Sequence, residues 1–301
     1  MSSIRQAVRE LSNRGDVFTC PVRIDSVTTI SPGLLRIRVT GPGLTDYRDP
    51  RPADAFKIAI PVDGGPIDFP GRRSDRLPVW NDGPRPLLRA FTVRGVAEDR
   101  SWLDFDAWWH GDAYTAGWLR RAPDGTEIGI SGMRREFVPA LGVDRHVLVG
   151  DACALPAVAA IVESLPDGTA VTAVLGVADE ADRAVLPERS RLDVHWTSNS
   201  SPYGSDTELA AAVRHALPEP TGERLQVWIG AEAGVVREVR RYVLDHDLVA
   251  RDDLHASAYW KAGEDSTVRD AALLTEYQRL VADGASATDP DTRELAELGA
   301  S

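Results

Sequence analysis

The sequence predicts two domains of different class, a small antiparallel β-barrel followed by a parallel-sheet α/β domain, with a helical tail at the carboxyl end. Short segments that alternate apolar and polar residues fill the first half, whereas near-continuous apolar runs alternate with helical spacing in the second half. The 301 residues are enough for two domains. We place the barrel at residues 15–138, the α/β domain at 139–262 and the tail at 263–301.

The barrel prediction depends on six short strands separated by turn-rich segments. In residues 35–40 the apolar side chains of Leu35, Ile37 and Val39 alternate with polar ones, as in a strand with one buried face. A stretch rich in Pro, Gly, Asp and Arg is expected to form a long loop at 61–88. The expected strands are 22–27, 35–40, 55–60, 88–93, 103–109 and 126–130.

In the second half, strands and helices alternate, which is typical of a parallel sheet covered on both faces. The last dozen residues are expected to lack regular structure. The expected strands are 145–150, 170–177, 192–196, 226–229 and 254–260, and the expected helices are 154–164, 233–245 and 268–282.

Composition excludes several classes of function. The net charge of −12 makes the chain a poor general ligand for nucleic acid or an anionic membrane. Zincin, nucleophile-elbow and Walker motifs are absent, and the six histidines lack metal-ligand spacing, so we expect no metal site. The sequence has no signal peptide or apolar span of membrane length, and its two cysteines are distant, which favours a cytoplasmic protein.

Residues 89–94, Arg-Ala-Phe-Thr-Val-Arg, are the first candidate binding segment. Arg89 suits a pyrophosphate because its guanidinium binds phosphate in a bidentate way. Phe91 offers a flat ring to pack against a cofactor, and Thr92 a hydroxyl. The alternative is an ordinary strand with exposed arginines, because short motifs produce false matches.

A second candidate segment, 149–157, follows a predicted strand and precedes a predicted helix. Ligands of open α/β sheets bind at such places, outside the carboxyl ends of the strands. The segment contains no G-x-G-x-x-G fingerprint, so it is not a standard Rossmann site. Cys153 is either a small buried filler or a redox-sensitive thiol.

These segments, in this order, resemble the siderophore-interacting protein family of FAD-containing ferric-siderophore reductases. The family's flavin motif R-x-Y-T-x-R matches residues 89–94 with Phe91 in place of Tyr, and its D-F-V-x-H-G-D segment matches around 104–112. The resemblance implies a ferredoxin-reductase-like fold and FAD as cofactor. The FAD-binding residues that it implies are Arg89, Phe91, Thr92, Val93, Asp106, His110, Thr115, Ala116 and Trp118.

The second half continues the resemblance. The family's G-D-E-T-A-L-P-A segment matches at 150–157, with Ala152 and Cys153 replacing Glu-Thr, and its G-E-A-x-x-x-R-x-x-R segment matches after 230. The resemblance implies that NADH or NADPH is the co-substrate. For Arg237 a solvated helix face remains the alternative. The implied NAD(P)-binding residues are Gly150, Asp151, Leu155, Pro156, Gly230, Glu232 and Arg237.

Only two residues of the chain are lysine, and both match family positions associated with the substrate pocket. Lys57 lies in a segment like V-K-L-x-x-P, and Lys261 replaces the Arg of G-Y-W-R-x-G. With Arg134, they imply a cationic pocket for an anionic ferric siderophore, since local positive charge must overcome the acidic surroundings.

The implied activity is hydride transfer from NAD(P)H to FAD and single-electron transfer to a siderophore-bound Fe(III), which releases Fe(II). We expect a monomer, and acidic residues after 177 favour NADH slightly. Two alternatives stay open. The sequence departs from the family's motifs at Phe91, 114–117 and 152–153. These departures would suit a degenerate member of the family that binds flavin weakly or not at all and binds a siderophore without reducing it. The third candidate is a reductase of the same fold acting on a quinone or a partner protein.

Overall fold

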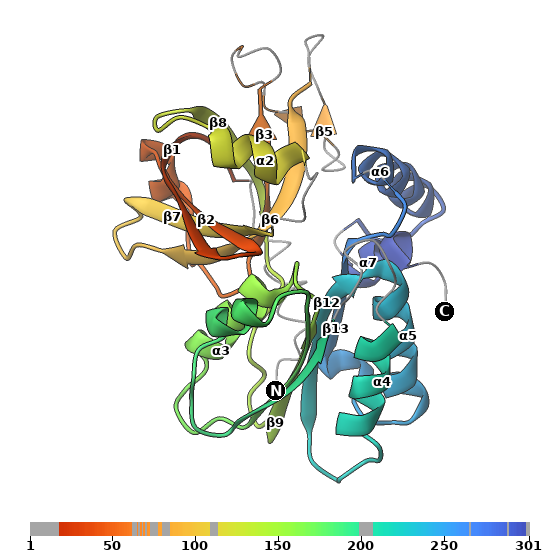
Figure 1. Ribbon diagram of the computed structural model, residues 1–301. Helices are drawn as coiled ribbons and strands as arrows, with labels where there is room; N and C mark the ends of the chain where they lie inside the picture. Colours follow the sequence, from red (N-terminus) through yellow and green to blue (C-terminus); the bar gives the residue numbers. More distant parts are fainter. Residues whose placement is uncertain are drawn as a thin grey trace.

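The structure, a computed structural model, contains two domains and a helical tail (Figure 1). No described helix combines the length and the apolar character needed to cross a membrane. The residues that the structure describes are 18–61, 65, 67, 69, 71–72, 78–79, 85–108, 114–198, 207–264, 266–287 and 289–298.

The first domain is a closed antiparallel barrel of six strands in the order β1-β2-β7-β6-β3-β8, which confirms the predicted fold class. Its last strand continues four residues beyond the predicted end at Ile130, because it pairs with both β1 and β3. The elements are β1 (Thr19–Ser31), β2 (Leu34–Thr40), η1 (Pro42–Asp46), β3 (Ala55–Ile60), β4 (Gly71–Arg72), β5 (Pro78–Val79), β6 (Leu87–Val96), β7 (Trp102–Trp108), α2 (Tyr114–Arg121) and β8 (Glu127–Arg134).

Strand β2 shows why the alternating pattern forms a barrel. Leu35, Ile37 and Val39 are buried in the barrel core, and the arginines between them lie outside. Arg36 pairs with Asp106 of the neighbouring β7 through two hydrogen bonds of 2.8 and 2.9 Å. Bidentate pairs of this kind fix the strand register as well as contributing energy.

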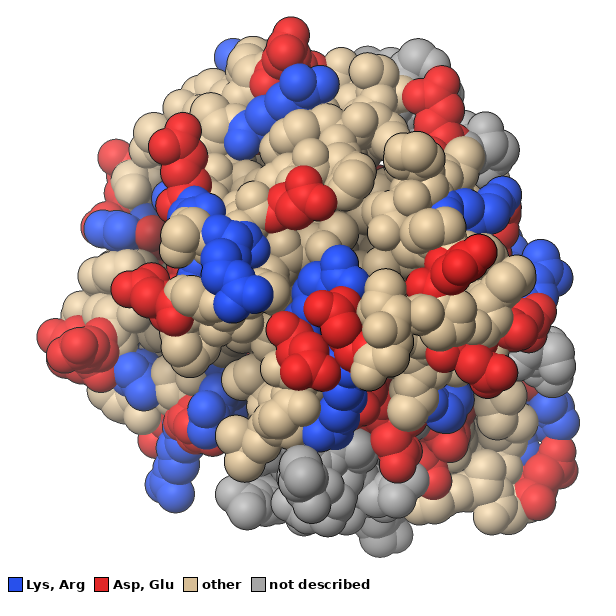
Figure 2. Space-filling view, turned by 90° about the horizontal axis from the view of Figure 1, so that it is seen from below, with Lys and Arg blue, Asp and Glu red and all other residues tan. Residues whose placement is uncertain are grey.

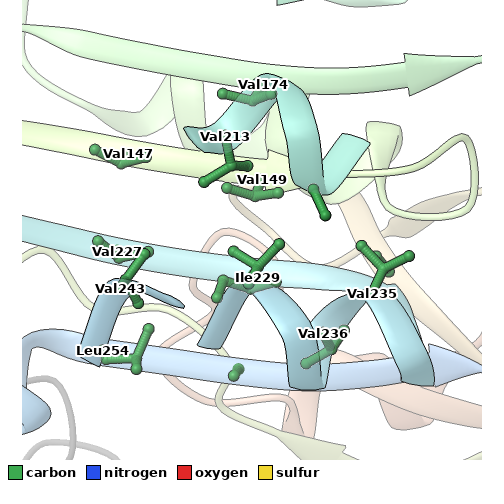
Figure 3. Packing of buried hydrophobic residues seen from close by; sticks show 14 of the residues in the cluster. Val147, Val149, Val174, Val213, Val227, Ile229, Val235, Val236, Val243 and Leu254 are labelled. Carbon is green, nitrogen blue, oxygen red and sulfur yellow. The ribbon is translucent and has the colours of Figure 1, made fainter. Parts of the chain in front are cut away.

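The second domain is a parallel sheet of five strands in the order β11-β10-β9-β12-β13. Helix α3 packs on one face, whereas α4, which the sequence analysis does not predict, and α5 cover the other. Figure 3 shows valines of the sheet and of these helices interlocking in that second core. The elements are β9 (Arg145–Gly150), α3 (Leu155–Ser164), β10 (Val171–Val177), η3 (Glu180–Val185), β11 (Leu192–Ser198), α4 (Thr207–Ala216), β12 (Leu225–Glu232), α5 (Ala233–Asp245), η4 (Arg251–Asp253) and β13 (Leu254–Trp260).

The tail forms two helices, α6 (Ser266–Ala282) and α7 (Pro290–Leu298). The expectation that the last dozen residues lack structure is therefore wrong for Pro290–Leu298. Glu294 of α7 accepts hydrogen bonds from Arg240 of α5 and pairs with Arg251 of η4 at 2.9 Å. These partners lie far away in the sequence, so composition alone could not predict that they hold the segment.

The two domains meet through apolar packing, in which Leu34 of the barrel joins the core around α3, and through polar contacts. Asp182 of η3 is almost fully buried, and its carboxylate accepts hydrogen bonds from the Ser31 hydroxyl at 2.5 Å and the Gly33 amide at 3.1 Å. On the other side, Arg94 of β6 donates two 2.6 Å hydrogen bonds to Glu163 of α3. Polar contacts at Asp182 and at Glu163 thus help to attach the barrel to the α/β domain.

We predict that Asp182→Ala lowers the free energy of unfolding by about 2 kcal/mol, because it leaves the buried Ser31 hydroxyl and the part-buried Gly33 amide without their acceptor. Urea denaturation followed by circular dichroism measures the loss. The control is Glu180→Ala in the same 3₁₀ helix, where the carboxylate is mostly exposed. Equal effects of the two substitutions would contradict the role given to Asp182.

Candidate functional site

One edge of strand β6 is unpaired where the first candidate segment lies. Strand β3 pairs with β6 from Leu87 to Thr92, but β7 pairs with it only from Val93 onward. No other described strand covers the remaining edge between Leu87 and Thr92. Backbone amides and carbonyls on such an edge can bind the polar rim of a flat ligand.

The side chains of β6 suit a phosphorylated ligand at that edge. Arg89 is half-buried, and its hydrogen bonds go to the Leu88 carbonyl and the Thr267 hydroxyl; no described acidic residue pairs with it. Its guanidinium therefore keeps donors for a phosphate. Thr92 is buried, and Val93 donates its amide to the Asp54 carbonyl at 2.8 Å.

Phe91 faces the barrel side of β6. Its ring is part-buried, with its centroid 4.9 Å from that of Phe105. The ring thus rests on the barrel core and offers only its remaining exposed part to a ligand. No hydroxyl is present at this position to bond a flavin.

Helix α2 carries three more of the residues predicted for FAD. Thr115 is half-buried, Ala116 is buried, and Trp118 packs against the barrel core. Asp106, predicted beside them, has its carboxylate engaged by Arg36. That pair makes Asp106 a support of the barrel wall. His110 lies outside the described residues.

At the carboxyl edge of the parallel sheet, two glycines face each other on neighbouring strands. Gly150 ends β9 and is paired in register with Gly230 of β12. A Cβ on Gly230 would lie 2.5 Å from the indole of Trp228, and one on Gly150 would lie 3.1 Å from the Cβ of Ala154. A side chain at position 230 would therefore displace Trp228, and one at 150 would be tightly packed, at the point where β9 and β12 send their helices to opposite faces of the sheet.

Asp151, directly after β9, joins three strands. One carboxylate oxygen accepts the Cys153 amide at 3.0 Å, and the other accepts the Glu232 amide at 2.9 Å and the Trp260 indole N–H at 2.7 Å. Burial raises the pKa of this carboxyl to about 6, against the lowering effect of these hydrogen bonds. The structure makes Asp151 an organiser of the sheet edge.

Glu232 has a similar internal role. Its side chain caps helix α5 by accepting the Val235 amide at 3.2 Å, and its other oxygen accepts the Ala262 amide, also at 3.2 Å. Among the other residues predicted for the nucleotide, Leu155 and Pro156 are buried in the first turn of α3. Arg237 is exposed on α5 and pairs with no described residue.

Strand β13 connects the two predicted sites. Tyr259 packs its ring edge-on against Trp228, and its hydroxyl lies 3.2 Å from that of Thr92 in the flavin segment. The next residue, Trp260, donates to Asp151 at the nucleotide edge. The end of β13 is therefore the place where the barrel segment and the sheet edge come together.

The three cations predicted for the substrate pocket all have acidic partners. Lys57 of β3 pairs with Asp270 of α6 at 2.6 Å, and Lys261 with Glu264 at 3.1 Å. Arg134, at the end of β8, pairs with the fully buried Glu136. Charges of both signs are likewise interspersed on the face of the molecule in Figure 2. The described residues include no group of three or more His, Cys, Asp or Glu that could hold a metal ion.

Sequence reasoning missed several residues of the site. Tyr259 and Trp260 belong to the segment that resembles G-Y-W-R-x-G. Their position directly before Lys261 was the signal that could have placed them in the site. Asp270 lies beyond the motifs, and nothing in its local sequence indicated a partner on the barrel. Glu264 lies only three residues after Lys261, and that short spacing was the available signal for its pairing. Glu136 lies two residues after its partner Arg134, and its carboxylate also lies 2.6 Å from His255, which is 119 residues away in the sequence.

The arrangement defines a class of protein. A closed antiparallel barrel followed by a parallel-sheet α/β domain is the plan of the ferredoxin-reductase-like fold. A ferredoxin reductase of carbazole 1,9a-dioxygenase has this fold, with a TM-score of 0.56 at 16% identity, covering 82% of this chain and 71% of that one.

The family follows from the sequence matches. The siderophore-interacting FAD-binding domain matches residues 23–137, and the siderophore-interacting protein domain matches residues 143–263. The chain belongs to the siderophore-interacting protein family. The first of these domains is an FAD-binding domain, so FAD is the cofactor that this assignment supports.

Several relatives support this assignment. The chain is 29% identical to the ferric vibriobactin reductase of Vibrio cholerae, covering 78% of this chain and 86% of that protein. It is 25% identical to the ferric acinetobactin reductase of Acinetobacter baumannii, covering 96% and 94%. A siderophore utilization protein from T. fusca has a similar structure, with a TM-score of 0.72 and 26% identity over 83% of this chain and 95% of that one.

We predict that Asp151→Asn destabilises the protein by about 3 kcal/mol at neutral pH. The side-chain NH₂ of asparagine would face N–H groups that now donate hydrogen bonds to the carboxylate. Thermal and urea unfolding measure the change. Asp167→Asn, on an exposed carboxylate, is the matched control and should have almost no effect. A loss no larger than that of the control would show that Asp151 does not organise the sheet edge.

Proposed function

We propose that the protein is a cytoplasmic, monomeric NAD(P)H-dependent ferric-siderophore reductase. The observation that supports this most is the convergence at the end of β13, which brings the open edge of β6 close to both the nucleotide edge and Lys261. The names of the curated relatives, including an NADPH-dependent ferric-chelate reductase of Escherichia coli, agree with it.

In this proposal Arg89 binds the pyrophosphate of FAD, and the edge of β6 binds the polar rim of its ring. FAD converts a two-electron donor into one-electron steps, so one hydride from NAD(P)H reduces two ferric complexes and yields NAD(P)⁺, two Fe(II) and one proton. The protein's own task is to bind and orient the partners. Reduction releases the metal because hard oxygen ligands hold Fe(III) better than Fe(II).

The nicotinamide nucleotide would lie across the switch point between β9 and β12. Because Asp151 and Glu232 use their carboxylates internally, they would act by fixing the backbone that touches the nucleotide. The glycine pair Gly150 and Gly230 keeps the strand ends free of side chains there.

The substrate would bind near Lys57 and Lys261, beside the end of β13. Both ammonium groups are part-exposed and within reach of solvent. An anionic ferric siderophore can be attracted by such groups when they exchange their internal carboxylate partners for the ligand.

Binding of FAD can be tested with the purified protein. We expect flavin absorbance after FAD loading and desalting, and about tenfold weaker FAD binding in Arg89→Ala, because a charged hydrogen bond to phosphate is lost. Arg48→Ala, an exposed arginine of the same domain, is the control and should bind FAD normally. A colourless wild-type protein would favour the siderophore-binding member without turnover.

The nucleotide preference follows from the end of β10. Asp179 and Glu180 lie directly after this strand, and the nearest described cation in this segment, Arg183, donates to Glu180 at 3.0 Å. A 2′-phosphate would meet these carboxylates, so we expect a severalfold higher kcat/KM for NADH than for NADPH. Steady-state oxidation of each nucleotide with a ferric siderophore measures the ratio, and faster turnover of NADPH would contradict the expectation.

A further inference from the structure

The beginning of helix α6 lies across the strand pair that carries the proposed site. Asp270 contacts Lys57 of β3 at 2.6 Å, and the Thr267 hydroxyl accepts from Arg89 of β6 at 3.1 Å. Arg269 anchors the same turn by donating to the Ala258 carbonyl of β13 at 2.7 Å. A single helical turn thus meets the flavin strand, the substrate lysine and the connecting strand.

The attachment of α6 is polar. None of its described residues is buried, and Val268 and Leu274 are 61% and 36% exposed. An amphipathic helix usually gains its stability by burying an apolar face, whereas Leu273, Tyr277 and Leu280 of this helix are only part-buried. Its attachment to the barrel is made by hydrogen bonds and an ion pair, which water and ligands can replace.

The Lys57–Asp270 pair is open to such replacement. The two side chains are 35% and 36% exposed, so solvent screens their attraction. The carboxylate nevertheless neutralises the lysine at close range. Any anionic ligand that approaches Lys57 must either displace this carboxylate or bind beside it and be repelled.

We propose that Asp270 is a specificity-determining residue, which competes with anionic ferric chelates for Lys57 and so sets the charge preference of the pocket. This inference rests on the proposed function, because it takes Lys57 as a substrate contact. A triply anionic tris-catecholate complex has to overcome the competition. A neutral tris-hydroxamate complex does not, because it gains no Coulomb attraction from a free lysine.

The test uses gallium(III) complexes, which keep the charge and coordination of the ferric ones but are not reduced. Calorimetry with the FAD-loaded protein measures the Kd of gallium tris(catecholate) and of neutral gallium tris(acetohydroxamate). We expect Asp270→Asn to lower the Kd of the trianion about fivefold at low salt and to leave the neutral complex unchanged. The gain should shrink as salt is added.

Two further variants distinguish competition for Lys57 from a general effect of removing negative charge from α6. Glu276→Gln removes the same charge from the same helix, but Glu276 pairs with Arg279 and should not affect either Kd. In a Lys57→Ala background, Asp270→Asn should lose most of its effect, as a double-mutant cycle measures directly. Circular dichroism and FAD content check that the variants are folded.

The outcomes are distinguishable. Equal gains for both complexes, or an undiminished gain without Lys57, would overturn the competition and leave the reductase proposal intact. An unchanged Kd for the trianionic complex in Asp270→Asn would also overturn the competition and leave the reductase proposal intact. If neither complex binds to any variant and ferric siderophores do not accelerate NAD(P)H oxidation, the proposed function fails as well.

Discussion

The carboxylate of Asp151 is the constraint on which the site depends most. It is buried, lacks a cationic partner among its hydrogen bonds, and accepts from donors in the turn after β9, in β12 and in β13. Because a buried charge needs such donors, the strand ends can take few other arrangements. The fixed end of β13 then places Tyr259 against Thr92, and through it the α/β domain against the flavin strand.

The fold was predictable because its signals are local. Alternation in residues 35–40 predicts β2, and the apolar run at 145–150 predicts β9 with the bounds that the structure has. Helix α4 and the last tail helix were not predicted, since short amphipathic segments give weak signals and α7 is held by arginines of α5 and η4.

The site was predictable only in part, for a physical reason. Motifs located Lys57, Arg89 and Asp151, because their order along the chain is visible in the sequence. Two of the acids that neutralise the cations are local, since Glu136 and Glu264 lie two and three residues after Arg134 and Lys261. The third, Asp270, is 213 residues away from Lys57. Pairing at that separation depends on how a helix packs on a barrel, which no local pattern indicates. The sequence therefore indicated Lys57 as a candidate cation but could not reveal that Asp270 neutralises it.

The open edge of β6 has a consequence for the protein before it is loaded with cofactor. An unpaired strand edge offers the same donors and acceptors to another polypeptide as to a ligand, and such edges are templates for intermolecular pairing. FAD lying along this edge would compete with self-association. If FAD binds there as proposed, the solubility of the newly made chain would depend on the supply of flavin.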